Sequence, residues 1–200
     1  MTIRALALLA AAVLPGAAAD PVNGKVLGNP GAPIRLEIFS DFSCPGCKAL
    51  HENLLPILIR DFVNPGKAFI VFRDYVLPPL PGHKFSADAA RFAVAANRVG
   101  KYQKVADALF LNQASWAMTG AVWEVVAPVL TPSEQKKVQA LVKNPAINDE
   151  VTRDTDAGKR AGLAKTPTVG VNFRNQHQMW NQWTPDNALF LGYLRELLKR

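Results

Sequence analysis

The sequence predicts an α/β fold, in which a mixed sheet carries helices on both faces and a helical segment is inserted between the two halves of the sheet. Three observations lead to this fold class. Two short apolar segments enclose a helical pattern within the first 75 residues. Helical spacing alone then continues through the middle of the chain. Strand character returns only near residue 166, before a last helix, and such an alternation favours a sheet covered on both sides.

The first 19 residues have the order of a secretory signal peptide. Arg4 supplies a positive start, Ala5 to Leu14 form an apolar run, and an A-x-A site ends at Ala19. The run is shorter than a membrane-spanning helix requires. We therefore expect cleavage after Ala19 and a soluble protein exported to the periplasm. An uncleaved anchor and a buried N-terminal helix are the alternatives.

The charge of the chain is basic but dispersed. The formal net charge is +7, from 23 Lys and Arg against 16 Asp and Glu. The basic residues form no patch interleaved with aromatic side chains, so we expect no nucleic-acid partner. After cleavage the chain is long enough for one domain with a hydrophobic core, and such a domain does not need a disulfide in order to fold.

The first half of the chain predicts a strand, a helix and a second strand. After a polar arm that ends at Pro33, "IRLEIFS" (34–40) and "KAFIVFRDY" (67–75) are rich in apolar residues and read as strands. Between them, apolar residues recur at helical spacing from residue 44 to residue 62. Pro56 lies inside this pattern, where it should kink the helix.

A proline-rich stretch, "VLPPLPGH" (76–83), marks a boundary, and a helical block follows it. Ser86 is expected to cap the first of these helices, and Thr131 with Glu134 forms a capping box at the start of another. The segments with helical spacing are 87–99, 101–113, 133–143 and 148–163.

The last third of the chain predicts a return to the sheet. "TPTVGVNF" (166–173) reads as a strand that pairs with residues 177–183 through a turn at Arg174, and a final amphipathic helix starts at Thr184. We therefore expect a sheet domain formed by residues 20–80 and 160–200, with a helical domain inserted at residues 81–159.

Both cysteines lie in "FSDFSCPGCKAL", where the first strand ends and a helix begins. Free N–H groups and the helix dipole at that position favour Cys44 as a thiolate, which is the nucleophile of disulfide exchange. Cys47 follows about one turn later, within reach of Cys44. Pro45 suits a first helical turn, and Gly46 leaves room for an approaching chain. A C-x-x-C pair after a strand and before a helix indicates redox chemistry.

The sequence offers less support for two other roles of the pair. A structural disulfide across two residues would constrain very little of the unfolded chain. A zinc site needs about four ligands, and the local candidates are Cys44, Cys47 and His51, the last of which reads as an ordinary helix-surface histidine. We therefore expect no metal and no other cofactor. A non-catalytic peptide-binding module with a structural disulfide stays an alternative.

Four motifs together, "FSDFSCPGC", "FRDYVLPPLPGH", "LFLNQASW" and "TPTVGVN", resemble the DsbA family of exported thiol–disulfide oxidoreductases over residues 30–198. The resemblance implies a thioredoxin fold with an inserted helical domain. It implies that Cys44 is the exposed nucleophile, that Cys47 is the buried resolving thiol, and that Thr166 and Pro167 form a cis-proline loop facing them. It also implies protein substrates and a membrane redox partner that regenerates the pair.

Three departures from the family pattern bear on function. Gly46 replaces a histidine found in the best-studied oxidants, so we expect a less strongly oxidising pair, and a reductase or isomerase kept reduced by a membrane partner is the alternative. Glu37 is one position out of register with the acid that often serves proton transfer in this family, which leaves Asp41 as a substitute or both as surface carboxylates. Lys165 replaces a glycine, where it adds charge near the thiolate or projects into solvent.

Three tryptophans are candidates for the wall of an apolar groove that binds unfolded substrate chains. They are Trp116, Trp180 and Trp183. Packing in the core is the other role open to each, and it is the one that we expect.

Overall fold

A computed structural model describes residues 25–78, 82–181, 183 and 187–200. The signal peptide expected at residues 1–19 and the helix start expected at Thr184 lie outside these residues. Within them, no helix combines the length and apolar character needed to cross a bilayer.

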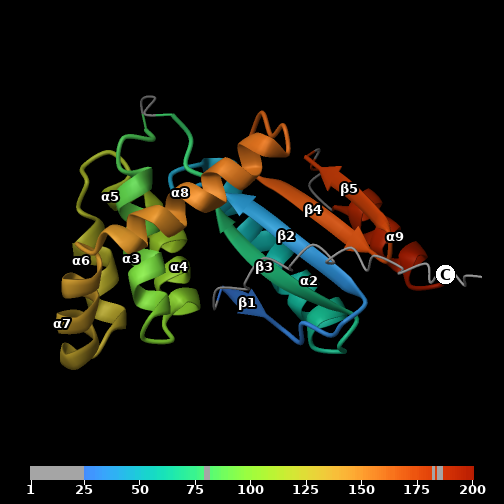
Figure 1. Cartoon of the computed structure of the whole chain (residues 1–200), viewed down its shortest axis with the longest axis horizontal. Helices are drawn as coiled ribbons and strands as arrows, with labels where there is room; N and C mark the ends of the chain where they lie inside the picture. Colours follow the sequence, from blue (N-terminus) through green and yellow to red (C-terminus); the bar gives the residue numbers. More distant parts are fainter. Residues whose placement is uncertain (1–24, 79–81, 182, 184–186) are drawn as a thin grey trace, which may run out of the picture.

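A five-stranded mixed sheet forms the centre of the molecule (Figure 1). The order of its strands is β1-β3-β2-β4-β5, in which β2 and β3 are parallel and the other neighbours are antiparallel. The mixed sheet is as predicted, except that the short β1 falls in the arm for which no element was expected. The strands are β1 (Val26–Leu27), β2 (Ile34–Ser40), β3 (Ala68–Asp74), β4 (Thr168–Phe173) and β5 (Gln176–Trp180).

One long helical segment connects β2 to β3. It consists of α1 (Pro45–Ala49), η1 (Leu50–Leu54), α2 (Leu55–Leu58) and η2 (Ile59–Val63). Both η segments are π-helical, and the N–H of Leu55 donates to the carbonyl oxygen of Leu50. The irregularity predicted at Pro56, which has no N–H to donate, thus takes the form of widened turns on both sides of it.

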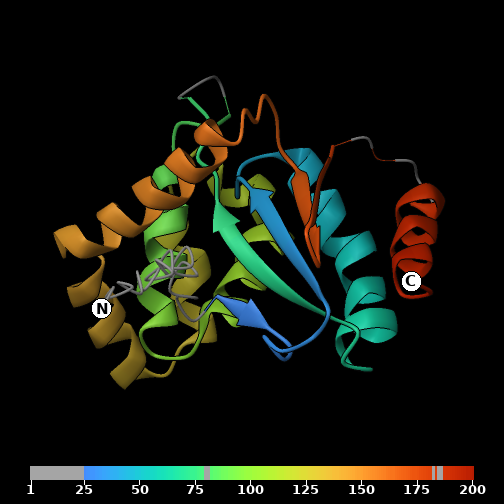
Figure 2. The same ribbon diagram turned by 45° about the vertical axis from the view of Figure 1, so that its right-hand side comes forward.

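A block of helices lies between β3 and β4 in the sequence and to one side of the sheet in space (Figure 2). Its last helix, α8 (Pro145–Arg160), crosses the sheet near the ends of its strands, on the face away from the 45–63 segment (Figure 1). A further helix, α9 (Ala188–Leu197), follows β5. The block contains α3 (Ser86–Asn97), α4 (Tyr102–Leu111), α5 (Gln113–Trp116), α6 (Val122–Val126), η3 (Ala127–Val129), α7 (Pro132–Leu141) and α8 (Pro145–Arg160).

Side chains of β2 alternate between two environments. Ile38 and Ser40 line a small cavity together with Cys47 of α1. Glu37 points to the opposite face, where it meets Arg73 of β3, and Arg73 reaches Asp154 of α8. The sheet therefore separates the cysteine helix from α8.

The predicted helix starts had different outcomes. The capping box of Thr131 and Glu134 is confirmed, because both of its reciprocal hydrogen bonds are present. The prediction that Ser86 caps a helix is wrong: Phe85 occupies the cap position, and Ser86 Oγ is buried and donates to Asp41 Oδ1 at 2.7 Å. Ser86 is already the first helical residue, so its side chain stands one position too late to cap the helix.

Candidate active site

Cys44 is the cap residue at the start of α1. Its backbone is extended, with φ −76° and ψ 121°, and its carbonyl oxygen accepts the N–H groups of Cys47 (3.0 Å) and Lys48 (3.1 Å). The side chain is half-buried, whereas Pro45 and Gly46 beside it are exposed. A proline fits this first turn because its missing N–H would have had no helical partner. The nucleophile expected from the sequence is thus accessible at a helix N-terminus.

The thiol of Cys44 is strongly acidified. Its pKa falls to about 5, mainly because the Cys47 thiol donates a hydrogen bond to it. Partial burial opposes this shift, and Thr166 with the N–H groups of Gly46 and Cys47 adds to it. At neutral pH the sulfur is therefore a thiolate, the reactive form in disulfide exchange.

Cys47 has the opposite character. It is 1% exposed, and its Sγ accepts a hydrogen bond from the N–H of Asp41 at 3.4 Å. Burial, and next the interaction with Cys44, raises its pKa well above the usual range. Both cysteines are free thiols in this structure. The pair therefore combines an accessible thiolate with a buried protonated thiol.

The loop before β4 closes the site from the other side. The Thr166–Pro167 peptide bond is cis, and Cys44 Sγ lies 3.7 Å from the carbonyl oxygen of Thr166. Gly46 sits directly against this loop, since a Cβ at that position would lie 3.1 Å from Pro167 Cδ. Segments 122 residues apart thus meet around one sulfur. The side chain of Lys165, which directly precedes Thr166, is exposed.

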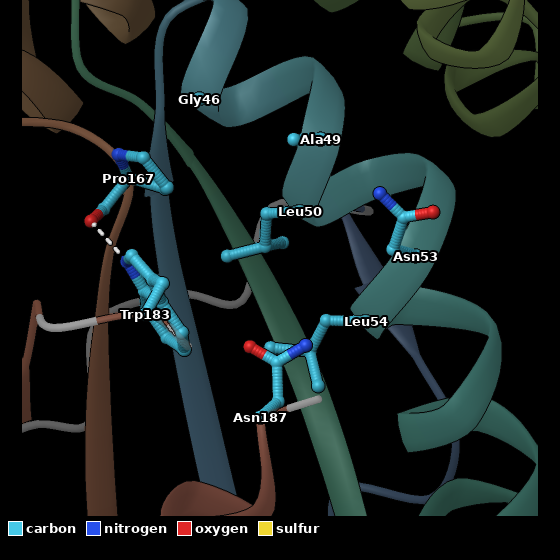
Figure 3. Close-up of a pocket in the computed structure, with 8 residues that line it drawn as sticks. All are labelled: Gly46, Ala49, Leu50, Asn53, Leu54, Pro167, Trp183 and Asn187. Carbon is cyan, nitrogen blue, oxygen red and sulfur yellow. Dashed lines mark hydrogen bonds between the residues drawn. The ribbon is translucent and has the colours of Figure 1, made fainter. Parts of the chain in front are cut away.

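An apolar groove of about 270 Å³ runs beside the cysteines (Figure 3). The 45–63 segment forms one wall, and Pro167 and Trp183 form the other, where Trp183 Nε1 donates to the Pro167 carbonyl oxygen at 3.0 Å. The groove thus begins next to the reactive sulfur. Its lining residues are Gly46, Ala49, Leu50, Asn53, Leu54, Pro167, Trp183 and Asn187.

The tryptophans have separate positions. Trp116 is fully buried, and its Nε1 donates to the Leu109 carbonyl oxygen at 2.8 Å. Trp116 therefore does not line the groove, and the expected packing in the core is confirmed, because the indole fills the core of the helical block. Trp183 does line the groove, while Trp180 stacks on Tyr193 of α9.

Neither of the two carboxylates considered for proton transfer faces the thiols. Glu37 lies on the far side of the sheet, paired with Arg35 and Arg73. Asp41 is 2% exposed, so it is not a surface carboxylate. Its oxygens accept from Ser43 N (2.7 Å), Ser86 Oγ (2.7 Å) and Leu77 N (2.8 Å), and these bonds give it a structural role in holding the loop before the cysteines.

Gln113 of α5 is a site residue that sequence reasoning missed. Its Nε2 donates to the carbonyl oxygens of Phe42 (2.7 Å) and Cys44 (3.1 Å). Lys48 makes a related contact, from its Nζ to the Phe110 carbonyl oxygen at 3.0 Å. The helical block therefore holds the start of α1. Gln113 begins α5, and nothing in the sequence pattern predicts which backbone groups its amide contacts.

His51 is a surface contact between helices. Its ring lies against Phe110, and its Nε2 is 2.8 Å from Asp107 Oδ1. In the part of the chain that the structure describes, no group of three or more His, Cys, Asp or Glu side chains is arranged to hold a metal ion.

Comparisons with known proteins agree with this geometry. A family model described as "Thioredoxin" matches residues 21–185. Disulfide bond formation protein D of Bacillus subtilis is 23% identical over 170 residues, which are 76% of this chain and 72% of that protein. Two crystal structures share the fold: alpha-DsbA1 of Wolbachia pipientis (TM-score 0.73, 18% identity, 88% of this chain and 90% of that one) and oxidised BdbD of Bacillus subtilis (TM-score 0.69, 23% identity, 90% and 95%). The chain therefore belongs to the thioredoxin family, and its fold is similar to that of DsbA structures.

Proposed function

We propose that this protein is a thiol–disulfide oxidoreductase that exchanges disulfides with substrate proteins through Cys44 and Cys47, and that it acts as an oxidant. One observation carries the proposal: two thiols on the first turn of one helix have pKa values displaced in opposite directions. A stable outer thiolate is a good leaving group, so it favours transfer of the disulfide to another protein.

The reaction balances with no further group. A substrate thiolate attacks Cys44 Sγ of the oxidised pair, the Cys44–Cys47 bond breaks, and its electron pair goes to Cys47, which takes up a proton. A second substrate thiolate then attacks the substrate sulfur of the mixed disulfide, and Cys44 leaves as a thiolate. Two substrate thiols are oxidised to one disulfide, the enzyme pair is reduced, and one proton is released.

The substrate segment would lie along the groove of Figure 3. Its apolar walls suit an unfolded chain that exposes hydrophobic side chains. The Thr166 carbonyl oxygen is available beside the sulfur for backbone contact, and Gly46 leaves the approach open. The name of the B. subtilis relative, a disulfide bond formation protein, supports this substrate class.

We further propose export to the periplasm and regeneration by a membrane redox partner. The N-terminal sequence pattern that ends at Ala19 supports export, and the need to reoxidise the reduced pair supports a partner. N-terminal sequencing of the protein purified from its native envelope tests the first part. An N-terminus at Asp20 is expected, whereas an intact Met1 contradicts cleavage after Ala19.

The catalytic role is tested with Cys44→Ser and Cys47→Ser in the oxidation of a reduced, unfolded protein. Cys44→Ser should abolish activity. Cys47→Ser cannot form the oxidised pair, so it should be inactive as well, but its Cys44 thiolate should attack a substrate that carries disulfides and accumulate mixed disulfides with it. If Cys44→Ser retains full activity, the proposal is wrong and the structural-disulfide alternative gains support.

The direction of electron flow has a separate test, because Gly46 favours a less oxidising pair. Equilibration with glutathione gives the potential of the pair. A value above that of thioredoxin, about −270 mV, supports the oxidant. A value at or below it would favour the reductase.

A further inference from the structure

Every turnover moves a proton onto or off Cys47, yet this sulfur is 1% exposed. The raised pKa of its thiol means that the anion formed when the disulfide opens must be neutralised. Bulk water does not reach the sulfur directly, so a buried group has to exchange the proton. Glu37 and Asp41 are not available, because one lies across the sheet and the other is held by three donors.

A small cavity of about 20 Å³ has Cys47 on its wall. This volume accommodates about one water molecule, provided that polar groups surround it. The polar side chains on its wall are those of Ser40, His51, Asp74 and Tyr102. The remaining wall is apolar, so a proton that leaves Cys47 has few acceptors within reach.

Asp74, the last residue of β3, is the carboxylate on this wall. It is 2% exposed, and it accepts hydrogen bonds from Lys25 Nζ (2.6 Å) and Tyr102 OH (3.1 Å). Lys25 also pairs with Asp154 and lies 3.9 Å from Glu150, both on α8. Together with Cys47 and His51, these are the titratable groups that face Asp74 from the surrounding elements.

Ser40 completes the path. It is the last residue of β2, in register with Asp74 on the neighbouring strand, and its side chain lines the same cavity as Cys47. A hydroxyl can accept one proton and donate another, so it can connect a thiol to a water molecule in the cavity.

We propose that Asp74 is the buried acid–base group that exchanges the proton of Cys47, through Ser40 and one water molecule in this cavity. The inference rests on the proposed roles of Cys44 and Cys47. It places the acid–base residue on β3, and not on β2, the strand that precedes the cysteines.

The step balances in both directions. When Cys47 resolves a mixed disulfide, its proton passes to the Asp74 carboxylate, its electron pair forms the bond to Cys44 Sγ, and the substrate sulfur leaves as a thiolate. When a substrate thiolate opens the oxidised pair, Asp74 returns the proton to the sulfur of Cys47. Asp74 touches Cys47 only through other groups, so it positions and relays the proton and does not act on the substrate.

The acidity of Asp74 suits this task. Burial raises its pKa to about 6, although the positive charge of Lys25 opposes the shift. An acid–base group is most effective when its pKa lies near the working pH. His51 is the competing candidate on the same wall, but its Nε2 already contacts Asp107 outside the cavity.

The test follows the lifetime of the mixed disulfide between Cys44 and glutathione, with acid quench and mass spectrometry over a range of pH. In the natural protein, resolution by Cys47 should accelerate as pH rises through about 6, because Asp74 becomes a base there. The double variant Lys25→Met with Asp74→Asn removes the acid and its cation together, which avoids an unpaired buried charge. It should resolve the mixed disulfide on the order of 100-fold more slowly near neutral pH and lose the inflection.

Two further variants separate a proton relay from loss of structure. Lys25→Met alone should move the inflection to higher pH, since the charge of Lys25 lowers the pKa of Asp74. His51→Gln should leave the inflection in place. Formation of the mixed disulfide, which depends on Cys44 alone, should keep its rate in all variants.

The outcomes are distinguishable. An unchanged inflection in a folded Lys25→Met, Asp74→Asn variant overturns the proposal, as does loss of the inflection in His51→Gln. If no mixed disulfide forms even in the natural protein, the proposed function fails instead.

Discussion

Gln113 donates a hydrogen bond to the backbone carbonyl oxygen of Cys44 over 3.1 Å, so a side chain from the helical block holds the residue that carries the reactive sulfur. The same amide bonds to Phe42 at 2.7 Å. Gln113→Leu should therefore lower the unfolding free energy by about 1–2 kcal/mol, because the buried carbonyl oxygen of Phe42 loses this donor. Chemical denaturation measures this cost.

A control for Gln113→Leu is the same change at Gln139, which is exposed on α7. That substitution should alter the unfolding free energy by less than about 0.5 kcal/mol. Equal effects at the two sites would contradict a stabilising role for the hydrogen bonds of Gln113 at the active site. Faster amide exchange at Cys47 and Lys48 in Gln113→Leu would locate the loosening at the start of α1.

The acidity of Cys44 predicts how the reduced protein responds to pH. Its folded pKa of about 5 lies below the unfolded value of about 8.5, so the thiolate stabilises the reduced fold fully above the unfolded value. That stabilisation is lost as pH falls from there through about 5. The difference in Tm between the reduced protein and Cys44→Ala should therefore grow as pH rises across this window. A difference independent of pH would show that the thiol is not acidified.

Gly46 should control the potential of the pair. Gly46→His places a cation beside the thiolate, and each pKa unit by which it lowers Cys44 corresponds to about 30 mV of more oxidising potential. Gly46→Ala is the matched control, because its Cβ meets the same contact of 3.1 Å with Pro167 Cδ without adding charge. Equilibration with glutathione compares the two. Equal shifts would mean that crowding, and not charge, sets the potential.

The groove should matter for protein substrates and not for small thiols. Ala49 is exposed on its wall, so Ala49→Glu places a charge where an apolar segment would bind. We expect oxidation of an unfolded protein to slow by about tenfold, since each 1.4 kcal/mol of lost binding is a factor of ten. Reaction with glutathione should stay the same, as should both reactions in Ala140→Glu on α7. Slowing with glutathione as well would indicate damage to the cysteine pair itself.

The secondary structure of this protein was largely predictable, because the spacing of apolar residues and the capping residues depend on neighbours in the sequence. The strand at residues 34–40 matches β2 at every position, and the capping box at Thr131 is present. The cysteine pair was identified for the same reason, since its spacing and its place after a strand are local. The division into two domains stays a prediction.

The remainder of the site depends on contacts between distant segments. Lys25 lies 49 residues from Asp74 in sequence and pairs with it in a buried cluster, although it was read as part of a polar arm. Trp116 is a large aromatic residue of the kind that can line a groove, but the surrounding helices enclose it. The sequence pattern predicts those helices without saying how they pack. Ser86 was interpreted as a helix cap and Gln113 had no assigned role, and only the fold gives these two side chains their partners.

The two ends of the inserted segment have a consequence for attempts to shorten this protein. Ser86, at the first turn after the proline-rich stretch, supports the carboxylate of Asp41, and Gln113 supports the carbonyl of Cys44. A trimmed chain that joins β3 directly to β4 would keep every strand of the sheet and both sulfurs. It would nevertheless leave the cysteine loop without two of its anchors, so a minimal scaffold needs new donors at these two points before it can reproduce the reactivity of the whole.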